Sequence, residues 1–188
     1  QHPEHHGLPI WRGSSVRRLR RCAMALSIAL LTISDPRCLA DDSSGDQLQR
    51  SLEAADHRLH ERQLCPDDRY QIRRELSRWI ADPEVDVVIT SGGTGLTGRD
   101  GTPEAVVPLL DKTMEGFGEL FRVLSFESIG TSTLQSRCLA GVANGTFVFV
   151  LPGSLDAVTT AWNRLIRAQL DADTRPCNLA QLRARLKE

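Results

Sequence analysis

The sequence has no CxxC pair, no strong net charge of either sign and no long apolar run, and each absence excludes a class of protein. Its five cysteines are odd in number and scattered, which is typical of reduced thiols in a cytosolic protein and argues against a disulfide framework or a zinc site. No apolar stretch reaches the roughly 20 residues that a membrane-spanning helix needs. A formal net charge of −1 gives no reason to expect a general nucleic-acid binder. We therefore expect a cytoplasmic protein that binds neither membranes nor nucleic acid.

The remaining composition is that of an ordinary globular protein. The 188 residues are 40% hydrophobic and 25% charged, without internal repeats or low-complexity segments. A chain of this length can bury a sizeable core. We expect a tail over residues 1–23, either disordered or derived from upstream sequence, followed by a single domain over residues 24–188.

The start of that domain has two interpretations. Residues 17–21 (RRLRR), followed by an apolar run and by CLA at 38–40, resemble a secretory signal with a cleavage site. Alternatively, residues 27–34 (SIALLTIS) form the first buried strand. The strand is favoured because residues 35–37 (DPR) interrupt the apolar run well before the cleavage site. Cleavage would also remove a strand that the rest of the pattern requires.

Short apolar segments alternate with amphipathic ones along the rest of the chain. Strands are expected at 27–34, 58–65, 85–90 and 146–151. Helices are expected to begin near 43–46, at 66–68, at 102–103 and after 154, and to cover 116–128 and 134–142. Alternating strands and helices predict an α/β fold, a three-layer sandwich with a mostly parallel sheet.

In such sheets, ligands bind beyond the carboxyl ends of the strands. Three polar loops follow expected strands here, at residues 34–35, 91–100 and 152–154. We expect the functional site where these loops converge.

The glycine-rich loop 92–101 (GGTGLTGRDG) matches two nucleotide motifs only superficially. Its GxGxxG letters fit the dinucleotide fingerprint, but the helix is expected to begin at 102–103 rather than at the third glycine. The acidic residue that this fingerprint places about 20 positions on falls near Glu119, within a helical pattern. A P-loop would need Lys-Ser/Thr where Arg99-Asp100 stands. Neither motif is therefore present.

What remains is a loop rich in backbone N–H groups, with Asp100 in its wall. Backbone donors suit a phosphate, and a carboxylate beside a phosphate suits Mg²⁺, which typically takes one or two carboxylates plus phosphate oxygens. Asp67, at the start of the preceding helix, could supply the second carboxylate. The residues leave an alternative open, in which Asp67 is only a helix cap and Asp100 only a turn residue. Replacing Gly93 by valine is expected to weaken ligand binding and leave the fold intact.

Several longer motifs resemble one family. They are SGGTGLTGRDGTPEA at 91–105, GELFRVLSFESIGTSTLQSR at 118–137, LPGS at 151–154 and DTRPCN at 173–178. These motifs resemble the MoaB/MogA family of molybdenum cofactor biosynthesis proteins. The resemblance runs from about residue 28 to 178, and the stretch 116–137 is most similar to the B-type members.

The resemblance implies a molybdopterin-binding fold for residues 24–188. For the A-type branch it also implies an activity, the transfer of AMP from Mg-ATP to the molybdopterin phosphate, with Mg²⁺, ATP and molybdopterin as cofactor and substrates. The alternative is a carrier with the same fold, which binds molybdopterin or a precursor without turnover.

The resemblance also assigns roles to residues. It makes Asp67 and Asp100 the catalytic and metal-binding carboxylates. Together with the three polar loops, it gives the expected pterin and nucleotide contacts as Ser34, Asp35, Ser44, Gly45, Asp46, Ser91, Gly92, Gly93, Thr94, Gly95, Arg99, Gly153 and Ser154.

The segment 115–135 carries too many apolar residues for a single helical stripe against a sheet. They are Phe117, Leu120, Phe121, Leu124, Phe126, Ile129 and Leu134. The family resemblance implies trimers, paired into hexamers in B-type members. We therefore expect a homotrimer or hexamer in which residues 116–129 contribute to the contact.

Overall fold

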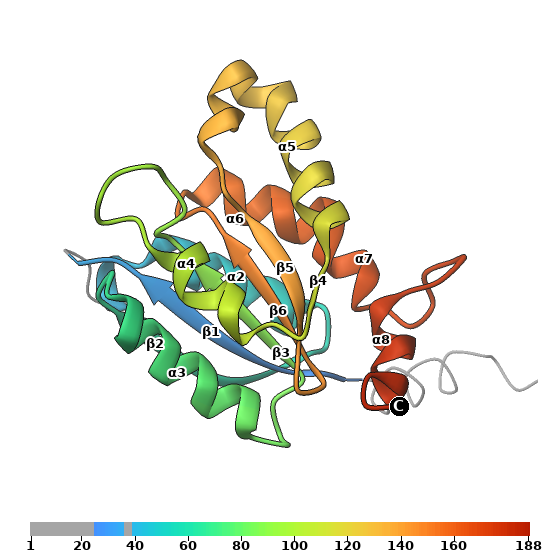
Figure 1. Cartoon of the computed structure of the whole chain (residues 1–188). Coiled ribbons are helices and arrows are strands. Elements are labelled where there is room, and N and C mark those ends of the chain that lie inside the picture. The colour runs from blue at the N-terminus through green and yellow to red at the C-terminus, as the bar shows by residue number, and fades with distance from the viewer. Residues whose placement is uncertain (1–24, 36–38) are drawn as a thin grey trace, which may run out of the picture.

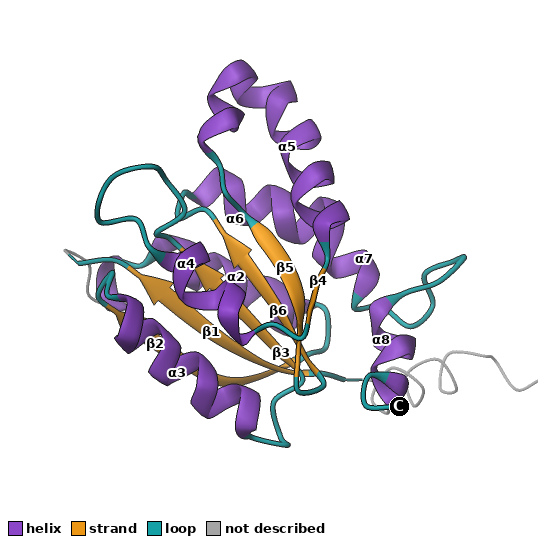
Figure 2. Ribbon diagram, viewed as in Figure 1, coloured by secondary structure: helices purple, strands orange, loops and turns teal. Residues whose placement is uncertain are grey.

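A computed structural model of the chain describes residues 25–35 and 39–188. The expected tail at 1–23 lies outside the described residues, as do residues 36–38. Within the described part, a six-stranded sheet stands between two layers of helices, as expected (Figures 1 and 2).

The sheet has the strand order β2-β1-β3-β6-β5-β4 and is mostly parallel. Its four parallel strands are β1 (Ser27–Ile33), β2 (Arg58–Cys65), β3 (Val87–Ser91) and β6 (Thr146–Leu151). Two antiparallel strands complete one edge, β5 (Leu139–Ala143) and β4 (Lys112–Thr113). β1 lies between β2 and β3 and is buried along its whole length, which confirms the strand interpretation of this segment.

One layer of helices consists of α2 (Ser43–Ala54), α5 (Glu115–Ile129) and α6 (Leu155–Ala161), which continues through a π-helical turn (Trp162–Ile166) into α7 (Arg167–Gln169). The other layer consists of α3 (Arg69–Ala81) and α4 (Thr102–Val106). Short 3₁₀ turns lie at Leu39–Asp41, Val107–Leu109, Gly130–Gln135 and Arg183–Arg185, and α8 (Leu179–Leu182) is near the carboxyl end. Among the described residues, no helix is long and apolar enough to cross a membrane.

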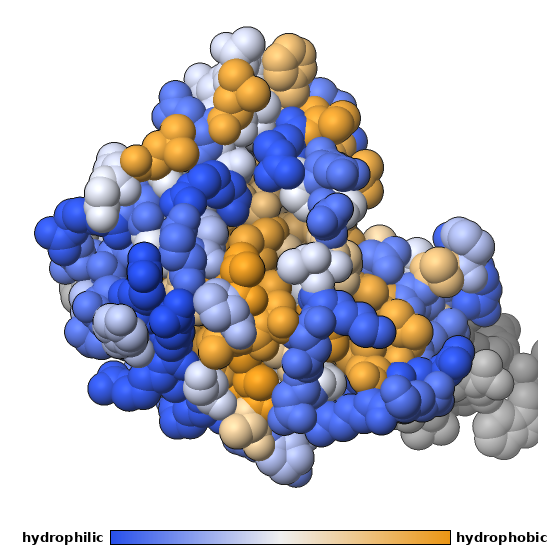
Figure 3. Space-filling view, viewed as in Figure 1, coloured by the Kyte–Doolittle hydropathy of each residue, from blue (hydrophilic) through white to orange (hydrophobic). Residues whose placement is uncertain are grey.

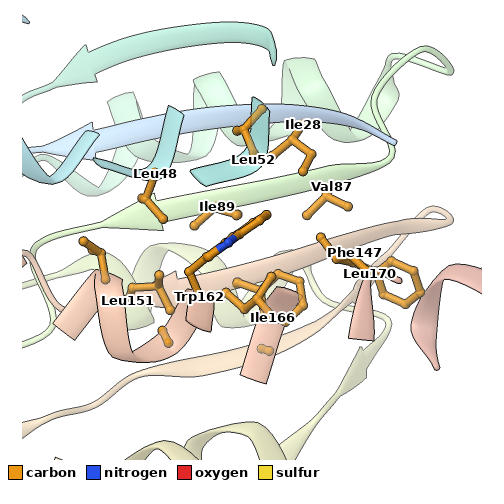
Figure 4. Packing of buried hydrophobic residues seen from close by; sticks show 14 of the residues in the cluster. Ile28, Leu48, Leu52, Val87, Ile89, Phe147, Leu151, Trp162, Ile166 and Leu170 are labelled. Carbon is orange, nitrogen blue, oxygen red and sulfur yellow. The ribbon is translucent and has the colours of Figure 1, made fainter. Parts of the chain in front are cut away.

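Two apolar cores, one on each face of the sheet, fix this arrangement. Successive strand residues point to opposite faces, so Ile28 and Leu30 of β1 pack toward α2 and α6, whereas Ala29 and Leu31 pack toward α3. Figure 4 shows the first core, where Leu48 and Leu52 of α2 and Trp162 of the π-helical turn meet the strand residues Ile28, Val87, Ile89 and Phe147.

One secondary-structure prediction is wrong. Residues 134–142, expected to be helical, form part of a 3₁₀ turn and most of β5, which pairs antiparallel with β6. The reason is the tight turn at Asn144-Gly145, where both residues have positive φ, 48° and 79°. An Asn-Gly pair favours a two-residue hairpin, and a hairpin requires a strand on each side.

Candidate functional site

The polar loops converge at the carboxyl edge of the parallel strands, as expected. The Gly92 amide, after β3, donates to the carbonyl of Leu151 at the end of β6 (3.0 Å). The Asp67 amide, after β2, donates to Oδ1 of Asp35, after β1 (3.0 Å). Four parallel strands thus deliver their loops to one place because their carboxyl ends share one edge of the sheet.

At the centre of this edge the chain turns so tightly that only glycine fits. Gly92 and Gly93 have φ of +103° and +69°. A Cβ at Gly92 would stand 2.2 Å from the carbonyl oxygen of Ile33, and a Cβ at Gly153 would stand 3.2 Å from the Cα of Gly92. The backbones of three loops therefore touch, and their spacing depends on the missing side chains.

The structure shows that a side chain at Gly93 would carry a cost in stability that the sequence did not predict. Its Cβ would lie 2.2 Å from Oγ1 of Thr102, which donates to the carbonyl of Gly92 (2.9 Å). We predict that Gly93→Ala lowers the free energy of unfolding by about 1–3 kcal/mol, through the left-handed backbone and the displaced hydroxyl. Urea denaturation measures this. Gly98→Ala is the matched control, because a Cβ there meets nothing within 4 Å. Equal stability losses in the two variants would contradict the prediction.

Asp67 is not the cap of α3. That role belongs to Asp68, whose Oδ1 accepts from the amides of Tyr70 (3.1 Å) and Gln71 (2.9 Å). The Asp67 carboxylate instead accepts from the Gly101 amide across the loop (3.3 Å). Its other oxygen faces the Gly93 turn, at 2.9 Å from the position of a Cβ there. The capping interpretation of Asp67 is therefore wrong, and its carboxylate borders the glycine loop.

Burial raises the pKa of Asp67 above its ordinary value, and the negative charges of Asp100 and Asp35 raise it further. The nearby Cys65 thiol also has a pKa raised by burial, to about 11, so it stays protonated near neutral pH. A cation placed beside Asp67 and Asp100 would relieve the repulsion between them.

Asp100 does have the turn role that the sequence left open. Its Oδ2 accepts from the amide (3.0 Å) and the hydroxyl (2.7 Å) of Thr97. The hydroxyl of Thr97 is the largest cause of a lowered Asp100 pKa, and backbone donors from Thr97 and Gly95 add to it. Asp100 is thus held ionised, with a carboxylate that stays partly exposed to solvent.

An ion pair closes one side of the site. The guanidinium of Arg99 contacts the carboxylate of Asp35, which links the loop after β3 to the loop after β1. The Arg99 side chain is 74% exposed, so it can exchange Asp35 for an anionic ligand at small energetic cost.

The residues of α2 that were expected to contact the ligand already make hydrogen bonds or ion pairs within the protein. Ser44 is buried and its hydroxyl donates to the carbonyl of Gly153 (2.8 Å). The Gly45 amide donates to the buried carboxylate of Asp42 (3.0 Å). Asp46 pairs with Arg62 at 2.7 Å. These interactions tie the start of α2 to the neighbouring loop, so the polar groups of Ser44 and Gly45 are already paired within the protein.

The remaining expected residues line or support the loop. Ser34 and Asp35 stand at the end of β1, where the Ser34 amide donates to the carbonyl of Cys65 (3.0 Å). Ser91 and Thr94 are buried. Ser154 is exposed and caps α6, its hydroxyl accepting from the Ala157 amide (3.1 Å).

Three supporting residues, Asp42, Arg62 and Arg137, are absent from the sequence-based prediction. Asp42 accepts from the Thr32 hydroxyl (2.6 Å) and pairs with Arg62 (3.0 Å) beneath the start of α2. An acidic residue directly before a helix start is a usable signal for Asp42. Arg137 donates to the carbonyl of Gly95 (2.9 Å), and 42 residues separate the two, so nothing local in the sequence could reveal this contact.

The carboxylates and backbone N–H groups of the site suit a phosphate together with Mg²⁺ better than a metal ion bound by protein side chains alone. Among the described residues, no three His, Cys, Asp or Glu side chains gather as a metal site. Two carboxylates beside a turn of backbone N–H groups match Mg²⁺, which completes its shell with phosphate oxygens and water. A separate apolar cavity of about 280 Å³ is lined by residues of α5, β6, the π-helical turn, α7 and α8, with none from the glycine loop.

Comparison with known proteins gives consistent matches. The family model described as a probable molybdopterin binding domain matches residues 29–172. Molybdenum cofactor biosynthesis protein B of Escherichia coli K12 is 54% identical over 151 residues, which are 80% of this chain and 89% of that protein.

Solved structures agree. A crystal structure of molybdenum cofactor biosynthesis protein B superposes with a TM-score of 0.76 at 41% identity, covering 78% of this chain and 91% of the other. A structure of MogA gives 0.67 at 29% identity, covering 77% and 97%. The chain therefore belongs to the MoaB/MogA family of molybdenum cofactor biosynthesis proteins.

Proposed function

We propose that this chain transfers AMP from Mg-ATP to the phosphate of molybdopterin. The observation that carries the proposal is the placement of Asp67 and Asp100 against a single turn of glycines. A Cβ at Gly93 would lie 2.9 Å from Asp67 Oδ2, and one at Gly95 would lie 2.7 Å from Asp100 Oδ2. Two carboxylates and a row of backbone donors are what a magnesium-bound phosphate group requires.

In the proposed reaction, an oxygen of the molybdopterin phosphate attacks the α-phosphorus of ATP, and pyrophosphate leaves with the electrons of the broken P–O bond. Both reacting groups are anionic, so the protein has to position them and neutralise their charge. We assign phosphate binding to the Gly92–Gly95 turn, through the amides of Gly93 and Thr94, and to Arg99, because the Gly92 amide already donates to Leu151 and the Gly95 amide to Asp100. Ser34, Asp35 and the 153–154 loop shape the adjoining wall. Asp67 and Asp100 would hold Mg²⁺, which supplies the neutralising charge.

A non-catalytic carrier is the second candidate. The Asp100 carboxylate already accepts two hydrogen bonds from Thr97, which hold it within its own loop. A carboxylate so engaged has fewer lone pairs free for a metal. This arrangement suits a protein that binds molybdopterin or a precursor and passes it on unchanged.

One assay separates the two. The purified chain is incubated with molybdopterin, ATP and Mg²⁺, and both adenylylated molybdopterin and pyrophosphate are measured. Equal amounts of the two products support the transferase. Tight molybdopterin binding without either product supports the carrier, and absence of both binding and product rejects the two together.

We also infer that the chain works in the cytoplasm. Cys65, Cys138 and Cys177 are free thiols, and two of them are buried with a pKa raised to about 11. Reduced cysteines without a disulfide role are typical of that compartment.

The pKa of Asp67 predicts the acid limit of the reaction. Magnesium binding requires the ionised carboxylate, whose pKa lies above its ordinary 3.8. The pKa of Asp100 is lowered, so Asp67 is the last of the pair to ionise as pH rises. At Mg²⁺ concentrations well below saturation, where the metal-free carboxylate is the titrating form, we expect the acid limb of turnover to lie above pH 3.8 and to move down in Asp100→Asn, which removes a repelling charge. Residual turnover followed against pH measures this. An acid limb that moves up in the variant would contradict the assignment.

A further inference from the structure

Arg137 joins both ends of the outer part of the glycine loop. Its Nε donates to the carbonyl of Gly95 (2.9 Å), and its terminal nitrogen donates to the carbonyl of Asp100 (3.3 Å). Its backbone amide donates to the carbonyl of Thr94 (3.3 Å). Residues 95 and 100 are the two ends of the segment that carries the exposed tip of the loop. The Arg137 side chain therefore holds the two ends of this segment together.

The guanidinium is itself held in place. Its third nitrogen pairs with the carboxylate of Glu104, on α4. The Arg137 side chain is 28% exposed, so solvent screens these interactions only in part. A planar guanidinium with several donors in a fixed fork can satisfy three acceptors at once, which a lysine ammonium on a flexible stem does poorly.

The loop has little other support at its tip. Leu96 is 68% exposed and Arg99 is 74% exposed. A Cβ at Gly98 would meet nothing within 4 Å. Within the loop, Asp100 accepts from Thr97 and from the Gly95 amide, and the hydrogen bonds that fix Gly95 and Asp100 to the rest of the described chain come from Arg137. Segments with few buried contacts open readily, so removing the hydrogen bonds of Arg137 should increase local opening of the loop.

We propose that Arg137 is a positioning residue that holds the 95–100 segment closed, so that the Asp100 carboxylate stays beside the ligand-binding turn. Glu104 orients the guanidinium for this task. The positioning role in catalysis rests on the proposed function, whereas the holding of the loop does not.

Hydrogen exchange of the ligand-free protein tests directly whether Arg137 holds the 95–100 segment in place. In Arg137→Met, which keeps an apolar stem and removes the donors, the hydrogen-bonded amides of Thr97, Asp100 and Gly101 should exchange about tenfold faster, as expected when hydrogen bonds to a charged group are lost. Arg137→Lys should give an intermediate increase. Arg78→Met is the control, because Arg78 donates to Glu61 and Glu75, which belong neither to the loop nor to the chain around Arg137. Unchanged exchange in Arg137→Met, or the same increase in Arg78→Met, overturns the proposal.

Ligand measurements then test the positioning. With Mg-ATP and molybdopterin as probes, Arg137→Met should lower kcat about tenfold or more and change the KM for molybdopterin much less. Arg137→Lys should recover part of kcat, while the melting temperatures of the two variants stay similar. Faster loop exchange with unchanged kcat overturns the positioning role. If the wild-type chain shows no turnover, the proposed function fails by itself, and the exchange result still decides whether Arg137 holds the loop.

Discussion

Replacing Asp67 or Asp100 by asparagine is expected to lower Mg²⁺-dependent adenylyl transfer by about 10²–10³-fold, the range seen when a group that stabilises developing charge is removed. Asparagine keeps the size and one hydrogen-bonding oxygen but removes the charge that holds Mg²⁺. Molybdopterin affinity should change little, because backbone amides supply its phosphate contacts in our proposal. Steady-state kinetics at saturating Mg²⁺ and calorimetric titration of molybdopterin measure the two effects.

The free energy of unfolding distinguishes a metal-binding role of Asp67 from a structural one. Burial and the charges of Asp100 and Asp35 raise the pKa of Asp67. A raised pKa favours folding below the ordinary pKa and loses that contribution as pH rises through the raised value. At neutral pH the ionised Asp67 therefore disfavours the folded state, and Asp67→Asn should not lower the free energy of unfolding.

A neighbouring residue gives the matched control. Asp68→Asn makes the same change one position away, at the cap of α3, where asparagine caps as well as aspartate does. Its turnover should equal that of the wild-type chain. If Asp67→Asn loses activity only in proportion to lost stability, or if Asp68→Asn loses as much, the metal-binding assignment is wrong.

A charge on the outer face of α5 is expected to change the molecular mass in solution. We propose that the chain assembles through this helix into a trimer of about 62 kDa, three times 20.8 kDa, or into a hexamer. Phe126→Asp places a charge where the partner would bury an aromatic ring, so the assembly should fall to a single chain. Light scattering at micromolar concentration measures the mass.

The apolar pattern of α5 supports this expectation. Phe117 and Phe121 are buried against the sheet. A second face stays open to solvent, with Leu120, Val123, Phe126 and Ile129 between 48% and 63% exposed and Leu134 beyond them at 79%. Figure 3 shows apolar side chains at the top of the molecule, where α5 rises from the sheet. Several exposed apolar side chains gathered on one helix mark an interaction site more often than a free surface.

Glu119→Gln is the control for this prediction, since Glu119 is an exposed polar residue of the same helix. It should leave the mass unchanged. A wild-type mass near 20.8 kDa would reject the assembly outright, and an unchanged mass in Phe126→Asp would move the contact to another surface.

Much of the fold follows from the sequence because its signals are local. The apolar runs at 27–33 and 146–151 are short and bounded by turn residues, which suffices to identify buried parallel strands. The helix start at Thr102-Pro103, which argues against a dinucleotide fingerprint, is also a local signal, and α4 does begin there. The antiparallel strand β5 has apolar residues that alone also suit a helix, and its local signal is the Asn144-Gly145 turn that pairs it with β6.

For the site too, the sequence predicted some features and only the tertiary structure decided others. Residue types and spacing made Asp67 and Asp100 candidates beside a glycine turn at the carboxyl edge of the sheet, because parallel strands bring their loops to one edge, and the family resemblance then selected them. Only the tertiary structure decided that Asp68, and not Asp67, caps α3 and that a side chain at Gly93 would strike Thr102. It alone brought Arg137 to Gly95. Such contacts join residues far apart in sequence, and their geometry is set by how the cores on both faces of the sheet pack, which no local pattern encodes.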